Sequence, residues 1–248
     1  YKTDFVPVDS EHFSIWSLLN KTKNKNVEKV FITASGGPFR NYPLNKFKNI
    51  KPEQALKHPN WSMGKKISID SATMMNKVFE IIEAKKIFDF SYNQLEIVIH
   101  PQSYLHAIIK FNNGLTKLLV HDTNMSIPIF NSVYSKYEKK ILSNKVDFNI
   151  LNNLNLNRMD KKRFPAVNIL SRLKNKDSLF ETVIVSANDC LVKLFLENKI
   201  KFTDISSILL KITKLKEFSK LKLITPKNIN QITRLSDYVS LKINSMSV

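Results

Sequence analysis

Three acidic residues could together hold a divalent cation. Asp9 and Glu11 follow the apolar residues 5–8, which we expect to form a strand. Side chains two positions apart point to the same side of a strand, so the two carboxylates would share one side. Glu80 would join them from a later helix, and oxygen ligands without a Cys or His pair suit Mg²⁺ or Mn²⁺ rather than Zn²⁺. On spacing alone, exposed acids without an ion are the favoured interpretation, because Asp-x-Glu often occurs by chance.

Polar residues close to Glu80 in the sequence could bind a phosphate. We expect a helix to begin near Ser71, where free backbone N–H groups and the positive end of the helix dipole favour an anion. Asn76 and Lys77 lie four and three residues before Glu80, a spacing that brings helical side chains together. Alternatively, Ser71 or Asp70 caps the helix and Lys77 is a solvated charge. These two interpretations are evenly supported at this point.

Two loops could also approach a ligand. Ser35 precedes the pair Gly36-Gly37, which follows a buried-looking apolar run and uses two of only 4 glycines in the chain. A second loop, residues 58–65, carries Trp61 between a Pro and a Gly, and loops with large aromatic side chains often close over ligands. The alternatives are a simple turn at a strand end and a Trp that fills a hydrophobic gap.

The elements that must position these residues indicate an α/β fold with a mixed sheet. A hairpin is expected around Asn112-Asn113-Gly114. Strands are expected at residues 5–8, 30–34, 95–99, 105–111 and 115–120, and helices at 12–19 and 73–88.

The rest of the chain predicts a helical part. Residues 164–173, 178–198, 204–218 and 228–247 have apolar residues at three- and four-residue steps, which predicts a C-terminal four-helix bundle. We therefore expect a catalytic domain at 1–136, a linker at 137–163 and the bundle at 164–248. Asn188 and Asp189 could support the site, but an inter-helix hydrogen bond is the preferred role.

Composition excludes several classes of protein. A hydrophobic fraction of 43% supports a core, and the single Cys190, expected in that core, excludes an internal disulfide framework. No apolar run approaches the length of a membrane span. The net charge of +18 would suit a nucleic-acid-binding protein, the main alternative, but the lysines are scattered and no recognition motif accompanies them.

Four segments, in order, resemble 1-deoxy-D-xylulose 5-phosphate (DXP) reductoisomerases. They are residues 6–12 (Val-Pro-Val-Asp-Ser-Glu-His), 35–40 (Ser-Gly-Gly-Pro-Phe-Arg), 58–64 (His-Pro-Asn-Trp-Ser-Met-Gly) and 67–76. His-Pro-Gln-Ser at 100–103 also fits, and Ala187-Asn188-Asp189 has Asp where the family has Glu. Four long motifs in order are far more specific than any one of them.

The resemblance implies a role for each matching residue. The implied metal ligands are Asp9, Glu11 and Glu80, and the implied substrate contacts are Ser10, Ser35, His58, Ser71, Asn76 and Lys77. His58, Trp61 and Met63 match the loop that closes over the substrate. The family isomerises DXP and reduces the product with NADPH to 2-C-methyl-D-erythritol 4-phosphate, in non-mevalonate isoprenoid biosynthesis. A Mg²⁺ or Mn²⁺ ion and a homodimer are implied as well, and a non-catalytic sugar-phosphate-binding module is a further alternative.

Departures from the family pattern set further expectations. No Gly-x-Gly-x-x-Gly follows a first strand, so we expect this chain to be the catalytic part without its N-terminal NADPH-binding segment. The polar residues 20–26 are shorter than the family's loop, which indicates a deletion or missing residues. The Asn- and Lys-rich background resembles a plastid (apicoplast) enzyme; otherwise we expect a soluble cytoplasmic protein.

Overall fold

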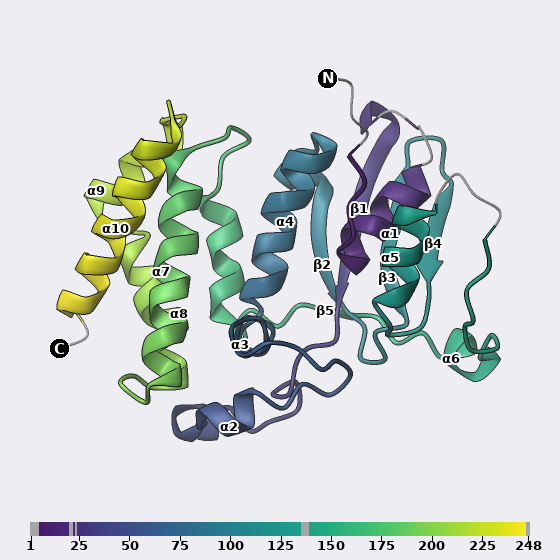
Figure 1. Ribbon diagram of the computed structural model, residues 1–248, viewed down its shortest axis with the longest axis horizontal. Helices are drawn as coiled ribbons and strands as arrows, with labels where there is room; N and C mark the ends of the chain where they lie inside the picture. The colour runs from purple at the N-terminus through teal and green to yellow at the C-terminus, as the bar shows by residue number, and fades with distance from the viewer. Residues whose placement is uncertain (1–4, 20–21, 23, 135–138, 247–248) are drawn as a thin grey trace. The chain divides into compact units, whose positions relative to one another are not determined.

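The computed structural model describes residues 5–19, 22, 24–134 and 139–246 (Figure 1). The chain forms two compact units, each made of two segments. Unit 1 contains Tyr1–Ser35 and Phe79–Met159, and unit 2 contains Gly36–Val78 and Asp160–Val248. Among the described residues, no helix has the length and apolar character needed to cross a membrane.

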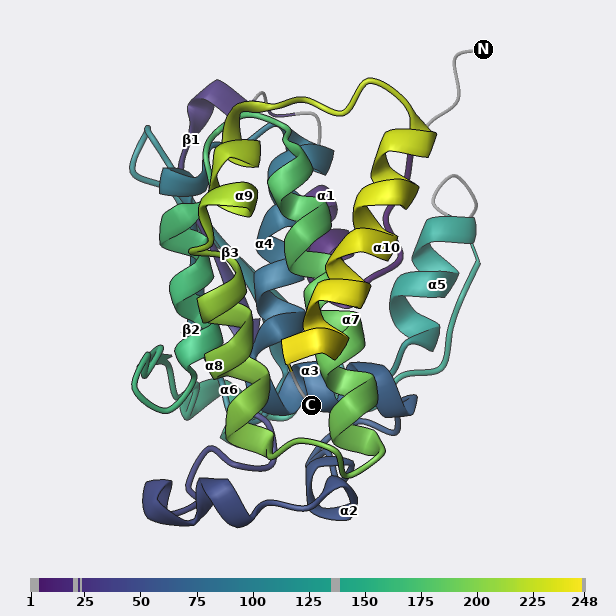
Figure 2. The same cartoon turned by 90° about the vertical axis from the view of Figure 1, so that its left-hand side faces the viewer.

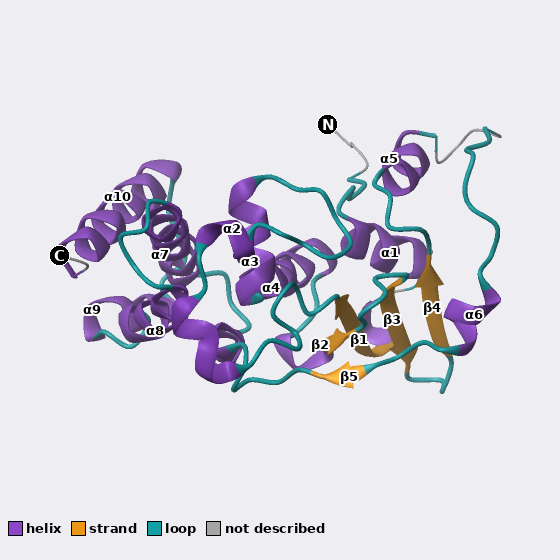
Figure 3. Cartoon of the chain, turned by 90° about the horizontal axis from the view of Figure 1, so that it is seen from below, coloured by secondary structure: helices purple, strands orange, loops and turns teal. Residues whose placement is uncertain are grey.

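Unit 1 is built on a mixed five-stranded sheet with the order β4-β3-β1-β2-β5 (Figure 3). The strands are β1 (Val27–Ala34), β2 (Leu95–Ile99), β3 (Leu105–Phe111), β4 (Thr116–Val120) and β5 (Asn157–Arg158). Only β1 and β2 pair in parallel; the other three pairs of neighbours are antiparallel. The expected hairpin joins β3 to β4, and Gly114 takes the positive φ of 86° that this turn requires.

Helices α1 (Ser10–Leu19) and α5 (Ser126–Val133) lie together over one face of this sheet (Figure 3). Unit 1 also contains α6 (Phe148–Asn152) and two 3₁₀ turns, η1 (Asn24–Asn26) and η3 (Tyr92–Gln94). The central strands are apolar on both faces, and Val30, Ile32 and Ile109 are fully buried. The predicted α/β class and mixed sheet are therefore confirmed.

The strand expected at residues 5–8 is wrong. These residues have no regular structure, and Phe5 and Val8 are exposed. Pro7 has no N–H to donate to a sheet. Asp9, two residues later, caps helix α1, which begins at Ser10. The apolar run was too short and too close to a helix-capping residue to join the sheet.

Unit 2 is mostly helical (Figure 2). Its α-helices are α2 (Pro52–Ala55), α3 (Lys65–Thr73), α7 (Leu179–Leu196), α8 (Phe202–Ile212), α9 (Lys216–Ser219) and α10 (Ile229–Met246). Its 3₁₀ segments are η2 (Leu44–Asn49), η4 (Pro165–Arg172) and η5 (Lys220–Leu223). Helix α7 packs against both α8 and α10, and Phe202 on α8 contacts the rings of Phe39, Phe47 and Phe195 at centroid distances of 5.1–6.0 Å.

The four-helix bundle is not confirmed in the form expected from the sequence. Residues 165–172 form a 3₁₀ segment rather than an α-helix, and the third expected helix is divided into α8 and α9. Only the segments that became α7 and α10 are single long helices. Apolar periodicity identified the buried faces, but it does not distinguish α from 3₁₀ geometry in short segments.

The boundary between the units passes through α4 (Met75–Phe88). Each compact unit is made of two segments that are separate in the sequence. The expected division at 1–136, 137–163 and 164–248 stays a prediction. The segment expected as a linker contributes α6 and β5, which pairs with β2, while residues 137 and 138 lie outside the described part. Residues 20, 21 and 23 of the short polar loop are also outside it, so the predicted deletion or missing segment stays a prediction.

Candidate active site

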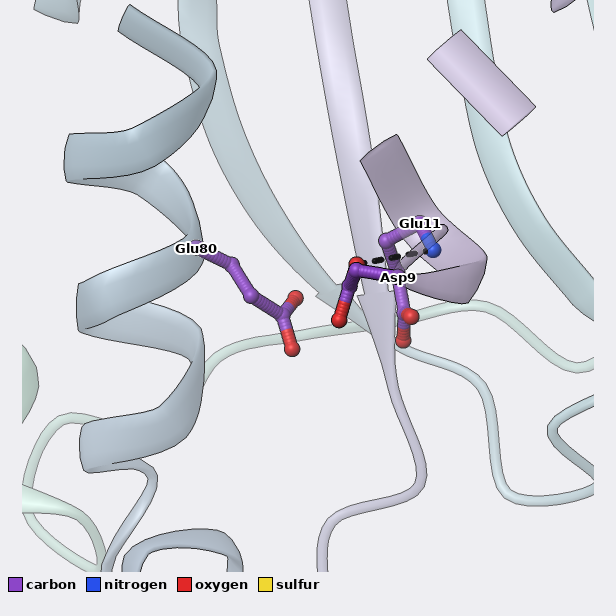
Figure 4. Close-up of side chains that lie close together, drawn as sticks. All are labelled: Asp9, Glu11 and Glu80. Atoms are coloured by element: carbon purple, nitrogen blue, oxygen red, sulfur yellow. Dashed lines mark hydrogen bonds between the residues drawn. The ribbon is translucent and has the colours of Figure 1, made fainter. Parts of the chain in front are cut away.

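Three carboxylates meet within unit 1. Asp9, Glu11 and Glu80 each offer an oxygen, and these oxygens lie within 4.8 Å of one another (Figure 4). Glu80 is only 2% exposed, Glu11 is half-buried and Asp9 is exposed. Two unit charges at this distance repel by about 3.5 kcal/mol at an effective dielectric constant of about 20. A set of oxygen donors that repel one another fits a hard divalent cation such as Mg²⁺ or Mn²⁺.

The start of helix α1 positions the first two acids. Asp9 precedes the helix, and its Oδ1 accepts hydrogen bonds from the backbone N–H groups of Glu11 and His12, both at 3.1 Å. Glu11 stands in the first turn. The two carboxylates are therefore placed by a helix cap and not by the alternation of side chains along a strand. Their proximity was predicted correctly, but the predicted cause was wrong.

His12 also belongs to this site, although it was not among the site residues predicted from the sequence. Its ring is buried, Nε2 lies 2.9 Å from the backbone oxygen of Glu80, and Nδ1 lies 3.2 Å from Asp9 Oδ1. The ring thus connects the start of α1 to the middle of α4. The available signal was its place three residues after the capping Asp9, one helical turn along the same face.

Two predicted substrate contacts belong to unit 1. Ser10 is buried, and its hydroxyl donates a short hydrogen bond to the Glu11 carboxylate. Its backbone oxygen accepts from Ser14 Oγ at 2.6 Å. Ser35 is buried directly after β1.

The other predicted phosphate contacts belong to unit 2, and the local structure differs from the expectation. Ser71 does not begin a helix, because it lies in the last turn of α3. Met74 then ends this helix with a left-handed φ of 65°. A new helix, α4, begins at Met75, so Asn76 and Lys77 stand in its first turn. The helix start expected near Ser71 is therefore the start of α4, where Thr73 Oγ1 accepts a hydrogen bond from the backbone N–H of Met75 at 3.4 Å. The sequence showed no Gly or Pro at this break, which is why one continuous helix was expected.

Lys77 is not the solvated charge of the alternative interpretation. Its residue is only 8% exposed, which is unusual for a lysine. A buried cation in the first turn of a helix adds its charge to that of the helix dipole, and both favour an anion.

The double glycine brings backbone close to Ser71 within unit 2. Gly36 and Gly37 have φ values of 87° and 63°, which L side chains rarely adopt. A Cβ at Gly37 would lie 3.0 Å from the backbone oxygen of Ser71, which is closer than nearly all Cβ contacts in proteins. This glycine therefore permits the turn to pack directly on the last turn of α3.

The loop between α2 and α3 is organised around His58. The Nδ1 atom of His58 accepts hydrogen bonds from the backbone N–H groups of Asn60 at 3.2 Å and Trp61 at 3.0 Å. Burial and the nearby Lys77 cation lower the pKa of His58 to about 4, so the ring is a neutral acceptor at physiological pH. Trp61 and Met63 are half-buried. The loop therefore has an ordered centre, and Trp61 is neither fully exposed nor fully buried.

Asn188 and Cys190 on α7 both contact neighbouring helices. Asn188 on α7 donates from Nδ2 to Asp70 Oδ1 on α3 at 2.7 Å, which confirms the expected inter-helix hydrogen bond. Cys190 was expected in the core, but it is half-buried and lies near Asn244 of α10. The residue before it on α7, Asp189, is exposed and the residue after it, Leu191, is buried. Cys190 therefore lies at the edge of the buried face of the helix.

Comparisons with known proteins agree with this geometry. Residues 5–88 match a family model described as "1-deoxy-D-xylulose 5-phosphate reductoisomerase C-terminal domain", and residues 121–240 match the "DXP reductoisomerase C-terminal domain". A protein of Pelagibacter ubique (strain HTCC1062) named 1-deoxy-D-xylulose 5-phosphate reductoisomerase is 70% identical over 248 residues, covering 100% of this chain and 64% of the relative. One from Sulfurihydrogenibium sp. (strain YO3AOP1) is 38% identical, covering 93% of this chain and 63% of the relative.

Solved structures of the same family have a similar fold. The reductoisomerase from Zymomonas mobilis in complex with NADPH has a TM-score of 0.86 and 30% identity, covering 98% of this chain and 61% of that one. A DOX-P reductoisomerase in complex with NADPH, fosmidomycin and magnesium also has a TM-score of 0.86, with 29% identity and coverage of 98% and 63%. The chain spans less than two thirds of the length of these relatives. The two curated relatives are bacterial, which gives no support to the expected plastid type. Two models together match most of the chain, which therefore carries the C-terminal domains of DXP reductoisomerases.

Proposed function

We propose that the protein containing this chain converts DXP to 2-C-methyl-D-erythritol 4-phosphate in the non-mevalonate isoprenoid pathway. The reaction combines a metal-dependent isomerisation with reduction by NADPH, and this chain supplies the residues for the metal and the substrate. The observation that carries the proposal is the convergence of Asp9, Glu11 and Glu80, whose oxygens lie within 4.8 Å of one another. Relatives in complex with NADPH, magnesium and fosmidomycin support the same cofactors and a phosphorylated sugar substrate.

Asp9, Glu11 and Glu80 would hold the Mg²⁺ or Mn²⁺ ion. When bound, this ion polarises the substrate carbonyl and stabilises the negative charge that develops during the rearrangement. Helix α1 fixes two of the acids through the Asp9 cap, and His12 connects that cap to the backbone of Glu80. This support keeps the carboxylates in place when no ion offsets their repulsion.

In unit 2, Ser71, Asn76 and Lys77 would bind the substrate phosphate. The buried Lys77 supplies charge at the positive end of the α4 dipole, Asn76 supplies an amide, and Ser71 supplies a hydroxyl. The phosphate does not react, so its binding free energy serves to orient the reacting carbons. In unit 1, Ser10 and Ser35 keep their predicted roles as further substrate contacts.

The loop with His58, Trp61 and Met63 would close over the substrate. Closure of a loop that carries a large aromatic side chain excludes water from the reacting carbons and protects an aldehyde intermediate before reduction. NADPH would bind to a part of the protein outside this chain, and we propose a homodimer on the basis of the family.

A steady-state assay of the full-length protein with DXP, NADPH and Mg²⁺ tests this function. Glu11→Gln should reduce kcat strongly with little change in phosphate affinity, whereas Lys77→Ala should mainly raise KM. Lys86→Ala, which changes an exposed lysine on the same helix, is the matched control and should match the wild type. Loss of NADPH absorbance that needs neither DXP nor Mg²⁺, or an unchanged KM for Lys77→Ala, would contradict the assignment.

A further inference from the structure

A buried carboxylate next to Ser71 is held by two partners within unit 2. Asp70 on α3 is only 1% exposed. Asn188 on α7 donates to its Oδ1 at 2.7 Å, and Lys66 donates to its Oδ2 at 2.8 Å. Lys66 also lies 3.0 Å from Asp189 Oδ1, at the half-exposed side of this group. Both oxygens of Asp70 therefore have charged or polar partners. One of these partners, Asn188, comes from helix α7.

Packing does not explain an asparagine at position 188. The residue is fully buried on α7, where its neighbours on the same face include the buried Ile184, Ala187 and Leu191. Among the described residues, its Oδ1 has no hydrogen-bond partner, which is an unfavourable state for a buried amide oxygen. An apolar side chain would avoid this cost, so the contribution of Asn188 lies in its hydrogen bond to Asp70.

The position of Asp70 determines where the backbone of Ser71 lies. Thr73 Oγ1 bonds back to the carbonyl oxygens of Ile69 and Asp70 at 3.1 and 3.2 Å, and Met74 then ends the helix in a left-handed conformation. On another side, a Cβ at Gly37 would lie only 3.0 Å from the carbonyl oxygen of Ser71, so the turn at Gly37 packs tightly on this residue. This last turn of α3 is thus held at Asp70 and closely packed at Ser71.

We propose that Asn188 is a positioning residue for substrate phosphate binding. Through its hydrogen bond to Asp70, it holds the last turn of α3 so that Ser71 can contact the phosphate and α4 can begin at Met75. Asn188 itself does not touch the substrate. The inference rests on the proposed phosphate role of Ser71 and extends the site to a residue of α7.

Substitutions in the full-length protein test this role. Asn188→Leu removes the hydrogen bond and should raise the KM for DXP and the Kd for fosmidomycin at least tenfold, with a smaller change in kcat. The exchange of the two residues, Asp70→Asn with Asn188→Asp, restores an amide-to-carboxylate hydrogen bond but gives Lys66 an amide in place of the Asp70 carboxylate, so it should recover part of the affinity. Binding of Mn²⁺ alone, followed by electron paramagnetic resonance, should not change in either variant, because the three acids belong to unit 1.

A matched control separates positioning from stability. Ser186 lies on the same helix and donates a partly buried hydrogen bond to Ser236 of α10 at 2.9 Å. Ser186→Ala should therefore lower the thermal midpoint without changing the affinity for DXP. If Asn188→Leu changes affinity no more than Ser186→Ala does, or if the exchange restores none of it, the positioning role is wrong.

The phosphate assignment has its own control. If Ser71→Ala weakens fosmidomycin binding and Asn188→Leu does not, only the positioning role is overturned. If Ser71→Ala binds fosmidomycin as the wild type does, the proposed phosphate site is wrong, and the role of Asn188 falls with it.

Discussion

Neutralising Glu80 should have opposite effects with and without metal. In the absence of an ion, Glu80 repels both Asp9 and Glu11 across distances of up to 4.8 Å, and each pair costs about 3.5 kcal/mol at an effective dielectric constant of about 20. Solvent reduces this cost, because Asp9 is exposed and Glu11 is half-buried. We therefore expect Glu80→Gln to raise the free energy of unfolding of the metal-free protein by about 1–3 kcal/mol.

The substitution leaves the contact between Glu80 and His12 in place. His12 bonds to the backbone oxygen of Glu80 and not to its side chain, so glutamine does not remove this link. Each kcal/mol corresponds to a shift of about 2–4 °C in the thermal midpoint for a protein domain of this size. A thermal melt in a chelator should show the variant melting above the wild type.

Metal should reverse the order of the two proteins. At Mg²⁺ concentrations 1,000 times its Kd, the wild type should gain about 4.1 kcal/mol, which exceeds the predicted advantage of the metal-free variant, while Glu80→Gln should gain little at the same concentration. Glu83→Gln on the same helix is the control, because Glu83 is half-exposed and lies outside the acid cluster, with its carboxylate 3.8 Å from His12 Nδ1. A Glu80→Gln variant that melts below the wild type in chelator, or gains as much from Mg²⁺, would refute the electrostatic reasoning.

Substitutions at three further positions test separate parts of the site. Asp9→Asn keeps an oxygen to cap α1 and should preserve stability, whereas Asp9→Ala should lose about 1 kcal/mol; both should abolish Mn²⁺ binding. The folded pKa of His58, about 4, lies below its ordinary 6.5, so its contribution to stability is present above pH 6.5 and is lost as the pH falls towards 4. His58→Asn keeps an acceptor without this titration, and melts between these pH values should show a weaker pH dependence. Gly37→Ala should destabilise the protein by about 1–3 kcal/mol in urea unfolding, because of its positive φ and the Ser71 contact; Gly64→Ala, with nothing within 4 Å, should stay within about 1 kcal/mol.

The sequence predicted the sheet better than the helix ends. The largely apolar segments at β2 and β3 gave the bounds that the structure shows, because most of their side chains are buried. The break at Met74 could not be predicted, because methionine is a good helix former and the left-handed conformation is maintained by its buried surroundings.

Proximity at the acid site was predictable, but its cause was not. The pattern Asp9-Ser10-Glu11 suits both a strand end and a capped helix start, and only the hydrogen bonds to Asp9 Oδ1 distinguish them. The burial of Lys77 and the link through His12 depend on packing between distant segments, which periodicity in one segment does not contain.

A crystal of the full-length protein soaked with Mn²⁺ tests the central claim most directly. Its anomalous difference map should show a single strong peak coordinated by carboxylate oxygens of Asp9, Glu11 and Glu80, and the peak should disappear in Glu80→Gln. A peak bound by other residues, or three acids left without an ion at saturating Mn²⁺, would contradict the account.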